Sequence, residues 1–322
     1  MHELGLLDQF LKLPHQEVSR LQAQIGREVV NLVDFSYLPA RCKFIAFMPQ
    51  WDFLDFLAEQ ARRYQSFSLR MNTEASGLIE EDGRIAGVVA RGGGDELHVR
   101  ADLVVAADGR GSIIRRCANL DVEDVGAPMD VLWMRLSRKE TDPHQTMGRI
   151  DAGVFFIMLN RDKYWQCAFL IPKGAADRYR AKGLEAFRQQ IAHIAPFTGD
   201  RLGELTSWDD IKLLTVKVDR LKRWYRDGLL CIGDCAHAMS PVGGVGINLA
   251  IQDAVATANL LHKPLSRGRC PQASLKMVQD RRLLPTRMTQ RHSSPARYTC
   301  RRDRHRFPCG AYKITRAREA IS

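Results

Sequence analysis

The sequence predicts a mixed α/β (α+β) protein. A short apolar strand at 229–232 is followed at once by a glycine-rich loop and by a long apolar helix at 246–261. Farther upstream, 129–137, 153–159 and 164–172 are rich in Val, Phe, Ile and Trp, and they are expected to form antiparallel strands. A strand–loop–helix unit and a separate group of antiparallel strands together favour two kinds of sheet in one chain.

The remaining elements follow from the spacing of apolar residues. Helical spacing predicts helices at 4–11, from residue 51 onward, and at 183–195, where Pro196 ends the pattern. A loop with a short strand is expected at 34–47. Further strands are expected at 68–75, 77–82, 85–91, 96–100, 101–107 and 211–219. The glycines at 92–94 are interpreted as a hairpin turn, because no helix follows them.

The composition is typical of a soluble globular protein. The 322 residues are 45% hydrophobic and 26% charged, which is room for about two domains and excludes disordered and fibrous classes. No apolar run reaches the roughly 18 residues of a membrane-spanning helix, and the start lacks the basic residues of a secretory signal. The eight cysteines are scattered without a C-x-x-C pair. We therefore expect reduced thiols, no metal site and a cytoplasmic location.

The net charge of +11 is concentrated at the end of the chain. Residues 263–322 hold 16 Lys and Arg against three acids, so the first 262 residues are nearly neutral. A basic tail can bind nucleic-acid phosphates or anionic lipid. We expect no nucleic acid as a partner, because 291–322 has neither helical nor strand periodicity. The possible metal ligands of this segment, Cys300, His305 and Cys309, fit no common zinc spacing. Our hypothesis is that 291–322 is read in a shifted frame or is otherwise foreign to the ancestral fold.

The segment 229–261 carries the strongest chemical signal. Its strand delivers Gly233 and Asp234 at the carboxyl end, where Asp234 can accept hydrogen bonds from sugar-like hydroxyls. The helix N-terminus that follows offers free N–H groups and a positive dipole end to an anion or a polarised carbonyl. An ordinary strand–loop–helix unit with Asp234 as a turn former is the alternative. The loop glycines that let a ligand approach the backbone closely are Gly243, Gly244 and Gly246.

This segment resembles the second FAD-binding motif of the group A flavoprotein monooxygenases, which are the para-hydroxybenzoate hydroxylase-like and ubiquinone-biosynthesis hydroxylase-like enzymes. Their pattern is Gly-Asp, then Ala-Ala-His-x-x-x-Pro, then a glycine-rich turn and an Asn. Cys235 stands here in place of the usual Ala. The matching residues are Gly233-Asp234-Cys235-Ala236-His237, then Pro241, then Gly243-Gly244-Val245-Gly246-Ile247-Asn248.

Two further matches lie upstream. The run Ala106-Ala107-Asp108-Gly109-Arg110-Gly111-Ser112 is similar to the family's Asp-Gly motif, which in relatives contacts both FAD and the pyridine nucleotide. Gln50, just ahead of the helix that begins at Trp51, matches a family position that contacts FAD. The resemblance covers about residues 1–290.

One part of the family pattern is missing. None of the 24 glycines sits in the G-x-G-x-x-G spacing of the family's N-terminal βαβ unit, whose helix takes the FAD pyrophosphate. The resemblance therefore implies an incomplete Rossmann-like FAD-binding domain of the GR2 type, truncated at the front, with an interleaved antiparallel β-sheet substrate domain. The expected division is 1–125 and 223–290 for FAD binding, 126–222 for the substrate domain, and 291–322 for the tail.

The implied activity is that of an FAD-dependent monooxygenase. Such an enzyme uses NAD(P)H and O2 to hydroxylate an aromatic or similar electron-rich small molecule through a flavin C4a-hydroperoxide. By the resemblance, Asp234 holds the ribityl chain or the adjoining ribose, and Pro241 lies against the isoalloxazine ring. The N–H groups of Ile247 and Asn248 point at the N1–C2=O edge of that ring. Asp108-Gly109 lies near the pyrophosphate or the nicotinamide route.

The substrate pocket and the catalytic base are less defined. His237 is interpreted as a packing or hydrogen-bonding residue rather than a general base, and no catalytic base can be named. Two alternatives stay open: an inactive truncated remnant that cannot retain FAD, or a flavin-dependent reductase or halogenase on the same fold. The oligomeric state is not predicted. Most aromatic side chains of the strands at 129–172 are expected to be plain core, and the candidates for the floor of the pocket are Trp133, Phe155, Phe156, Trp165 and Phe169.

Overall fold

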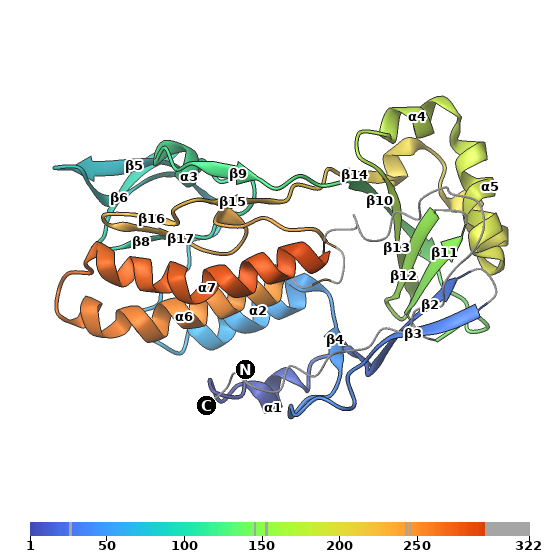
Figure 1. Cartoon of the computed structure of the whole chain (residues 1–322), viewed down its shortest axis with the longest axis horizontal. Coiled ribbons are helices and arrows are strands. Elements are labelled where there is room, and N and C mark those ends of the chain that lie inside the picture. The colour runs from blue at the N-terminus through green and yellow to red at the C-terminus, as the bar shows by residue number, and fades with distance from the viewer. Residues whose placement is uncertain (26–27, 145, 152–153, 242–243, 245, 294–322) are drawn as a thin grey trace.

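The computed structural model describes residues 1–25, 28–144, 146–151, 154–241, 244 and 246–293. These residues form two lobes, between which the chain passes more than once (Figure 1). We call them the sheet lobe, which contains a seven-stranded sheet, and the helix lobe, which contains three smaller sheets and the longest helices. None of the described helices is long and apolar enough to cross a membrane.

The seven-stranded sheet has the order β14-β10-β13-β12-β11-β2-β3. Neighbouring strands run antiparallel, except that β11 and β2 are parallel. Because β2 and β3 join it, the sheet takes residues from outside 126–222, and the division into domains stays a prediction. The strands are β2 (Arg20–Ile25), β3 (Glu28–Asp34), β10 (Met129–Ser137), β11 (Met147–Asp151), β12 (Val154–Asn160), β13 (Tyr164–Pro172) and β14 (Lys212–Leu214).

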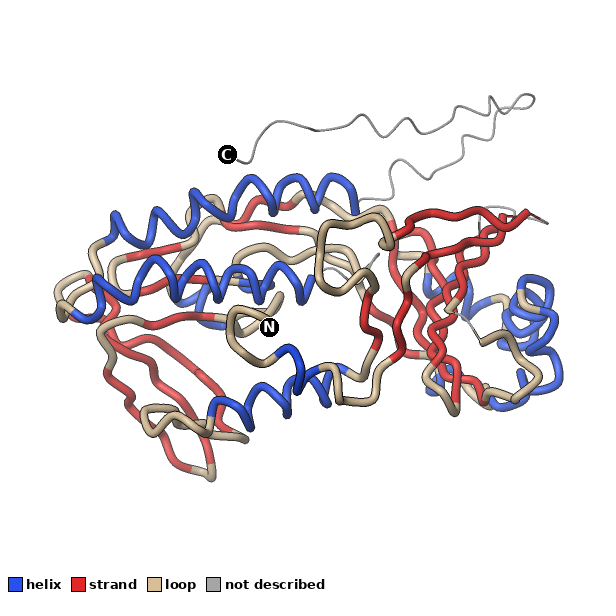
Figure 2. Tube along the Cα trace, turned by 90° about the horizontal axis from the view of Figure 1, so that it is seen from below, coloured by secondary structure: helices blue, strands red, loops and turns tan. Residues whose placement is uncertain are grey.

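One face of this sheet carries the core of the sheet lobe. Figure 2 shows helices beyond this face, on the side away from the helix lobe. The strand registers put Leu132, Phe156 and Phe169 side by side on it. Phe187 packs on Phe169 with ring centroids 5.1 Å apart, and burying such a side chain stabilises the fold by about 1.5–3 kcal/mol. The covering elements are α4 (Ala176–Ala181), α5 (Leu184–Ile194) and the 3-10 segment η1 (Pro196–Glu204).

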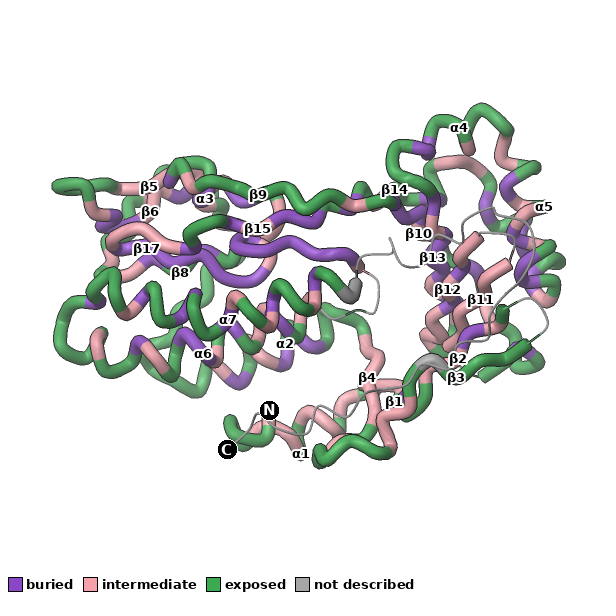
Figure 3. The backbone as a smooth tube through the Cα atoms, in the orientation of Figure 1, coloured by how far each residue is buried: buried purple, intermediate pink, exposed green. Residues whose placement is uncertain are grey.

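The helix lobe has a parallel strand pair at its centre. β8 and β17 pair in parallel, β16 runs antiparallel to β17, and an antiparallel meander of β5, β6 and β7 packs against them. A long stretch that begins just before β17, residues 228–240, is buried almost throughout (purple in Figure 3). The strands are β5 (Thr73–Glu81), β6 (Arg84–Gly92), β7 (Asp95–Arg100), β8 (Val104–Ala106), β15 (Asp219–Leu221), β16 (Tyr225–Arg226) and β17 (Leu229–Cys231).

Two long helices cover this core. α6 and α7 lie side by side, and Leu261, Leu275 and Val278 from them join the core of the helix lobe. The helices of this lobe are α2 (Gln50–Ala61), α3 (Ile113–Cys117), α6 (Gly246–Ser266) and α7 (Gln272–Ser293). The remaining short elements are α1 (Leu7–Phe10), β1 (Gln16–Val18), β4 (Ile45–Phe47), β9 (Val122–Asp124) and the 3-10 segments η2 (Trp208–Asp210) and η3 (Gly233–Cys235).

Several predicted elements are confirmed. β10 and β13 occupy the predicted residues, and β12 and α5 differ from their predictions by one residue at each end. The three strands are antiparallel as expected. α2 begins at Gln50, one residue before its predicted start, and the glycine run makes the turn between β6 and β7. α6 continues past its predicted end to Ser266, with Pro264 inside its last turn.

Other predictions are wrong in detail. The two strands expected at 68–75 and 77–82 are one strand, β5, whose register shifts between Ala75 and Gly77 at a bulge. The strand expected at 211–219 is divided between β14 in the sheet lobe and β15 in the helix lobe. The first helix and the strand expected at 101–107 shorten to α1 and β8. The sequence pattern does not predict β1, β2, β3, β11, α4 or α7.

Candidate functional site

Two loops leave the helix lobe at the carboxyl ends of neighbouring parallel strands. The pairing of β8 with β17 sets Ala106 opposite Cys231. Asp108 follows β8 and Asp234 follows β17, so both carboxylates leave the sheet at the same edge. This edge is where open α/β sheets bind their ligands.

The turn after β17 is held tightly against α6. Gly233 has a φ of +59°, and a Cβ at this position would lie 3.0 Å from the Cβ of Ala250. Both the backbone conformation and the close contact therefore require glycine. The Gly233 N–H donates to Oδ2 of Asp253 at 3.0 Å, which fastens the turn to the helix.

Asp253 is the buried acid that joins this turn to two helices. Its Oδ2 also accepts from Nε2 of His237 at 2.6 Å, and its Oδ1 accepts from Nε of Arg282 on α7 at 2.7 Å. Burial raises the pKa of the Asp253 carboxyl, but hydrogen bonds and the charge of these partners outweigh it and hold the pKa below the ordinary value. The hydrogen bonds of this network fix the orientation of the turn. Removing one partner would be strongly destabilising, because it would leave a charge buried and unpaired.

His237 takes part in this network and does not face the open edge. Its side chain is 1% exposed, and its ring lies 4.8 Å from that of Trp224. The geometry agrees with a packing and hydrogen-bonding residue rather than a general base.

Asp234 differs from its buried neighbours because its carboxylate is available. The side chain is 35% exposed, and among the described residues it receives no hydrogen bond. Its charged neighbour is Arg110, whose Nη2 lies 3.9 Å from Oδ2. Burial raises the pKa of the Asp234 carboxyl, and the positive charge of Arg110 opposes this rise. A ligand hydroxyl could therefore find an acceptor here.

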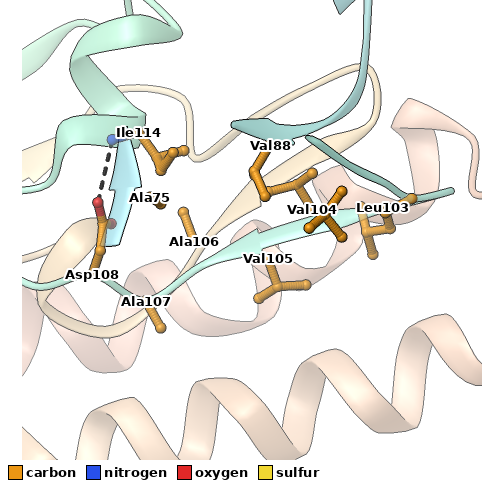
Figure 4. A pocket seen from close by; sticks show the side chains of 11 residues that line it. Ala75, Val88, Leu103, Val104, Val105, Ala106, Ala107, Asp108 and Ile114 are labelled. Carbon is orange, nitrogen blue, oxygen red and sulfur yellow. Dashed lines mark hydrogen bonds between the residues drawn. The ribbon is translucent and has the colours of Figure 1, made fainter. Parts of the chain in front are cut away.

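Asp108 is engaged by its own loop. Its Oδ2 accepts the N–H of Ile114 in α3 at 3.2 Å (dashed line in Figure 4). Burial raises the pKa of this carboxyl, but hydrogen bonds from Ser112, Ile114 and Cys235 outweigh it and lower the pKa overall. Gly109 follows with a φ of +80° and open space around it, so the loop can turn sharply at the sheet edge.

The N-terminus of α6 lies at the same site. Gly246, Ile247 and Asn248 form its first turn, whose N–H groups have no partners within the helix. A Cβ on Gly246 would lie 3.9 Å from Oδ1 of Asp234, which places the helix end beside the carboxylate. Figure 1 shows that this end of α6 points toward the sheet lobe.

The loop before α6 is described only in part. Pro241 is half-buried, and Gly244 has a φ of +63° with nothing close to it. Gly243 lies outside the described residues, as do Cys300, His305 and Cys309 of the tail.

Comparisons with known proteins identify the family. Residues 1–292 match the FAD binding domain family. The chain belongs to this family. The 6-methylpretetramide 4-monooxygenase of Streptomyces rimosus is 35% identical over 259 residues, which is 80% of this chain and 62% of that protein. The 12-dehydrotetracycline 5-monooxygenase/anhydrotetracycline 6-monooxygenase of Streptomyces rimosus subsp. rimosus is 28% identical over 235 residues, 69% of this chain and 45% of that protein.

Solved structures share the fold. A probable FAD-dependent monooxygenase from Pseudomonas aeruginosa superposes with a TM-score of 0.75 at 20% identity, covering 91% of this chain and 81% of that one. A 2-methyl-3-hydroxypyridine-5-carboxylic acid oxygenase gives a TM-score of 0.73 at 20% identity, covering 92% and 77%. The matched part of this chain spans 62% or less of the length of the two monooxygenases from Streptomyces.

The helix lobe also has an apolar groove along β8, which is not visible in the sequence pattern. The groove has a volume of about 310 Å³ and leads to Asp108 (Figure 4). Among the described strands, β8 pairs on one edge only, and Val105 is 42% exposed. Residues that line the groove include Ala75, Val88, Val99, Leu103 and Ile114.

Gln50 is placed differently from the other candidates. It is exposed at the first position of α2, and no contact among the described residues joins it to Asp108 or Asp234. Its role therefore stays a prediction.

The five aromatic candidates divide between two faces of the seven-stranded sheet. Phe156, Trp165 and Phe169 are fully buried in the core under α5, as expected for most of the five, and they do not line a pocket floor. Trp133 and Phe155 are half-buried on the opposite face, which is turned toward the helix lobe (Figure 2). The period-2 alternation of strands explains the division.

Sequence reasoning assigned no role to three residues of the site. Arg110 lies inside the recognised Asp-Gly run and Arg115 comes three residues after it, but their partners come from a distant segment. Asp253 had a signal, since it is a single acid in an otherwise apolar helix, and a buried acid requires partners.

Proposed function

We propose that this chain binds FAD at the edge formed by Asp234 and the N-terminus of α6, and that it serves an FAD-dependent monooxygenase. The observation that carries the proposal is a partly exposed carboxylate, without a hydrogen bond among the described residues, beside the free N–H groups of a 21-residue helix. An acceptor and several donors at one place suit a ligand that presents both hydroxyls and a polar ring edge.

The residues present fit the flavin half of FAD. Asp234 would accept hydrogen bonds from the ribityl chain, the N–H groups of Ile247 and Asn248 would donate to the N1–C2=O edge, and Pro241 would lie along the ring. The positive end of α6 would stabilise negative charge on the flavin by about 0.3–2 kcal/mol. FAD, when bound, accepts a hydride from NAD(P)H and activates O2.

The substrate proposed is an aromatic small molecule. Trp133 and Phe155 lie on the sheet face that is turned toward the helix lobe, where flat apolar side chains suit an aromatic ring. The names of the two Streptomyces relatives, both monooxygenases of tetracycline-type compounds, support an oxygen-inserting reaction. NAD(P)H is the proposed reductant and O2 the co-substrate, and we expect the cytoplasm as the compartment.

Visible absorbance tests the proposal directly. The purified chain is mixed with FAD and passed through gel filtration, and bound flavin is expected to travel with the protein. Bovine serum albumin treated in the same way controls for carry-over. NADPH-dependent oxygen uptake with aromatic substrates, and a product heavier by one oxygen atom, then test the reaction. A colourless protein after filtration would contradict FAD binding by this chain.

A further inference from the structure

An ion pair joins the loop that follows β8 to the loop that follows β17, on the side that faces solvent. Arg110 extends from the Asp108-Gly109 loop, and its Nη2 lies 3.9 Å from Oδ2 of Asp234. The two side chains are 40% and 35% exposed, so the pair is accessible to water and to a ligand. Among the described residues, the Arg110 guanidinium has no hydrogen bond, which leaves Asp234 as its partner.

The backbones beneath this pair are held in place by Arg115. Its guanidinium donates to the carbonyl oxygen of Arg110 at 2.8 Å and to that of Cys235 at 3.3 Å. It also forms a two-pronged, buried ion pair with Asp219, with N–O distances of 3.2 and 3.1 Å. One buried side chain therefore ties both loops together, and the spacing between Arg110 and Asp234 does not depend on their own weak attraction.

The charges around Asp234 come from three directions. Arg110 and His237 favour the ionised carboxylate, whereas Asp219 disfavours it and is itself paired with Arg115. The N-terminus of α6, at Gly246, adds a positive dipole end on the third side. Burial acts against the charge. Arg110 is thus the positive side chain that offsets the cost of keeping Asp234 ionised.

We infer that Arg110 is a positioning residue of the flavin site, which keeps Asp234 in the ionised form that accepts hydrogen bonds from the cofactor's hydroxyls. The inference rests on the proposed FAD binding. The form matters because an ionised carboxylate is purely an acceptor, whereas a protonated one also donates and binds hydroxyls less strongly. Asp234 is the residue that touches the cofactor, and Arg110 acts through it.

The first test needs no flavin. Asp is labelled with ¹³C, and the Asp234 carboxyl is titrated by NMR in the wild type, Arg110→Ala and Arg110→Lys, with Asp234→Asn to assign the signal. Arg110→Ala is expected to raise the titration midpoint by about half a pH unit. Arg110→Lys is expected to bring the midpoint most of the way back to the wild-type value, because it keeps a positive charge. Lys222→Ala is the matched control, because it breaks an exposed ion pair of the same 3.9 Å length, with Asp121. An unchanged midpoint in Arg110→Ala overturns the inference.

The second test uses riboflavin, which has the ribityl hydroxyls but no phosphate. Fluorescence titrations compare the same variants across the pH range of the NMR measurement. Arg110→Ala is expected to bind as the wild type does well above the midpoint, and about threefold more weakly below it, which is the factor given by half a pH unit. Equal weakening at every pH would show a structural role and overturn the inference.

FAD separates the remaining outcomes. If Arg110→Ala loses affinity for FAD but not for riboflavin at any pH, Arg110 is a phosphate ligand and the inference is wrong. If the wild type binds neither compound, the proposed function fails and the role of Arg110 in it fails as well, whatever the NMR midpoint. A parallel loss for both ligands, confined to acid pH, supports the inference.

Discussion

Asp108 and Asp234 are the same residue type at the ends of neighbouring strands, yet their surroundings give them different roles. The Asp108 carboxylate accepts hydrogen bonds from the first turn of α3 and from its own loop, and these bonds lower its pKa. Asp234 receives no such bonds among the described residues, and burial raises its pKa. The first residue therefore shapes the site, and the second is free to bind.

Replacement of Asp234 tests this difference. Asp234→Ala is expected to weaken FAD binding about 10- to 100-fold, because a hydrogen bond to a charged group contributes about 1.5–3 kcal/mol. The urea midpoint should not fall, since the carboxylate has no hydrogen bond in the fold to lose. Fluorescence titration and urea unfolding, measured on the same preparation, check the two statements.

Asp121→Ala is the matched control for that experiment. Asp121 is an exposed acid whose partner is Lys222, and its removal should change neither FAD affinity nor stability by more than about 0.5 kcal/mol. FAD affinity that is equal in Asp234→Ala and the wild type would exclude Asp234 from the site.

The turn between β16 and β17 joins two of the three small sheets of the helix lobe. The carbonyl of Asp227 accepts from the Ile85 N–H, and the carbonyl of Gly228 accepts from the Val104 N–H, both at 2.9 Å. Gly228 has a φ of +76°, and a Cβ there would lie 1.9 Å from the carbonyl oxygen of Ile85. The turn can press against β6 only because the residue is glycine.

Gly228→Ala is therefore expected to destabilise the protein by about 4 kcal/mol or more, because backbone atoms must move apart. Gly126→Ala is the control, since Gly126 has a nearly equal φ of +79° and nothing within 4 Å of its Cβ position. That variant should cost only the strain of the left-handed backbone, about 1–2 kcal/mol. Urea unfolding of both variants measures the difference, and similar losses would contradict the role of the close contact.

The elements that could be predicted from the sequence are those whose own residues show a clear apolar pattern. β10 and β13 are continuous apolar runs because most of their residues are buried, and this run is visible without tertiary information. β3 is largely exposed, so its residues follow no clear alternation. α7 contains Pro285 and has a polar surface, which hides its helical period. The bulge in β5 depends on its pairing with β6.

The same division holds for the candidate site. Gly233, Asp234 and the first turn of α6 lie within one short segment, so their pattern is readable in the sequence. The contacts of Arg110 with Asp234, and of Arg115 with Asp219 and Cys235, join segments far apart in the chain. Only the fold brings these residues together.

At the scale of the whole molecule, both lobes contain buried acids whose ionised forms stabilise the fold. Asp253 in the helix lobe is bound by His237 and Arg282. Asp142 in the sheet lobe is held by Arg201 and by the Trp165 indole. For both carboxyls burial raises the pKa, but their hydrogen-bond partners outweigh it and the pKa is lowered.

Acid is therefore expected to destabilise both lobes together. The folded pKa of each acid lies below its unfolded value near 4, so the stability it contributes is fully present above that value and is lost as the pH falls through the folded pKa. Urea midpoints measured from pH 7 to pH 3 should be nearly level down to about pH 5 and then fall steeply. Asp142→Asn should be less stable at pH 7 and show a shallower fall, and a midpoint that stays level to pH 3 would contradict the prediction.

The pairing of β8 with β17 has a consequence for biosynthesis. Most of the sheet lobe, from β10 to β14, lies between these two strands in the chain, and only β2 and β3 of its sheet precede β8. β8 therefore leaves the ribosome well before its partner exists. At about 5–20 residues per second, the wait is on the order of ten seconds. All strands of the sheet lobe precede β17, so this lobe is expected to complete first. The helix lobe, with Asp234 and α6, is then expected to assemble last, which would make the proposed cofactor uptake a late event in the maturation of the nascent chain.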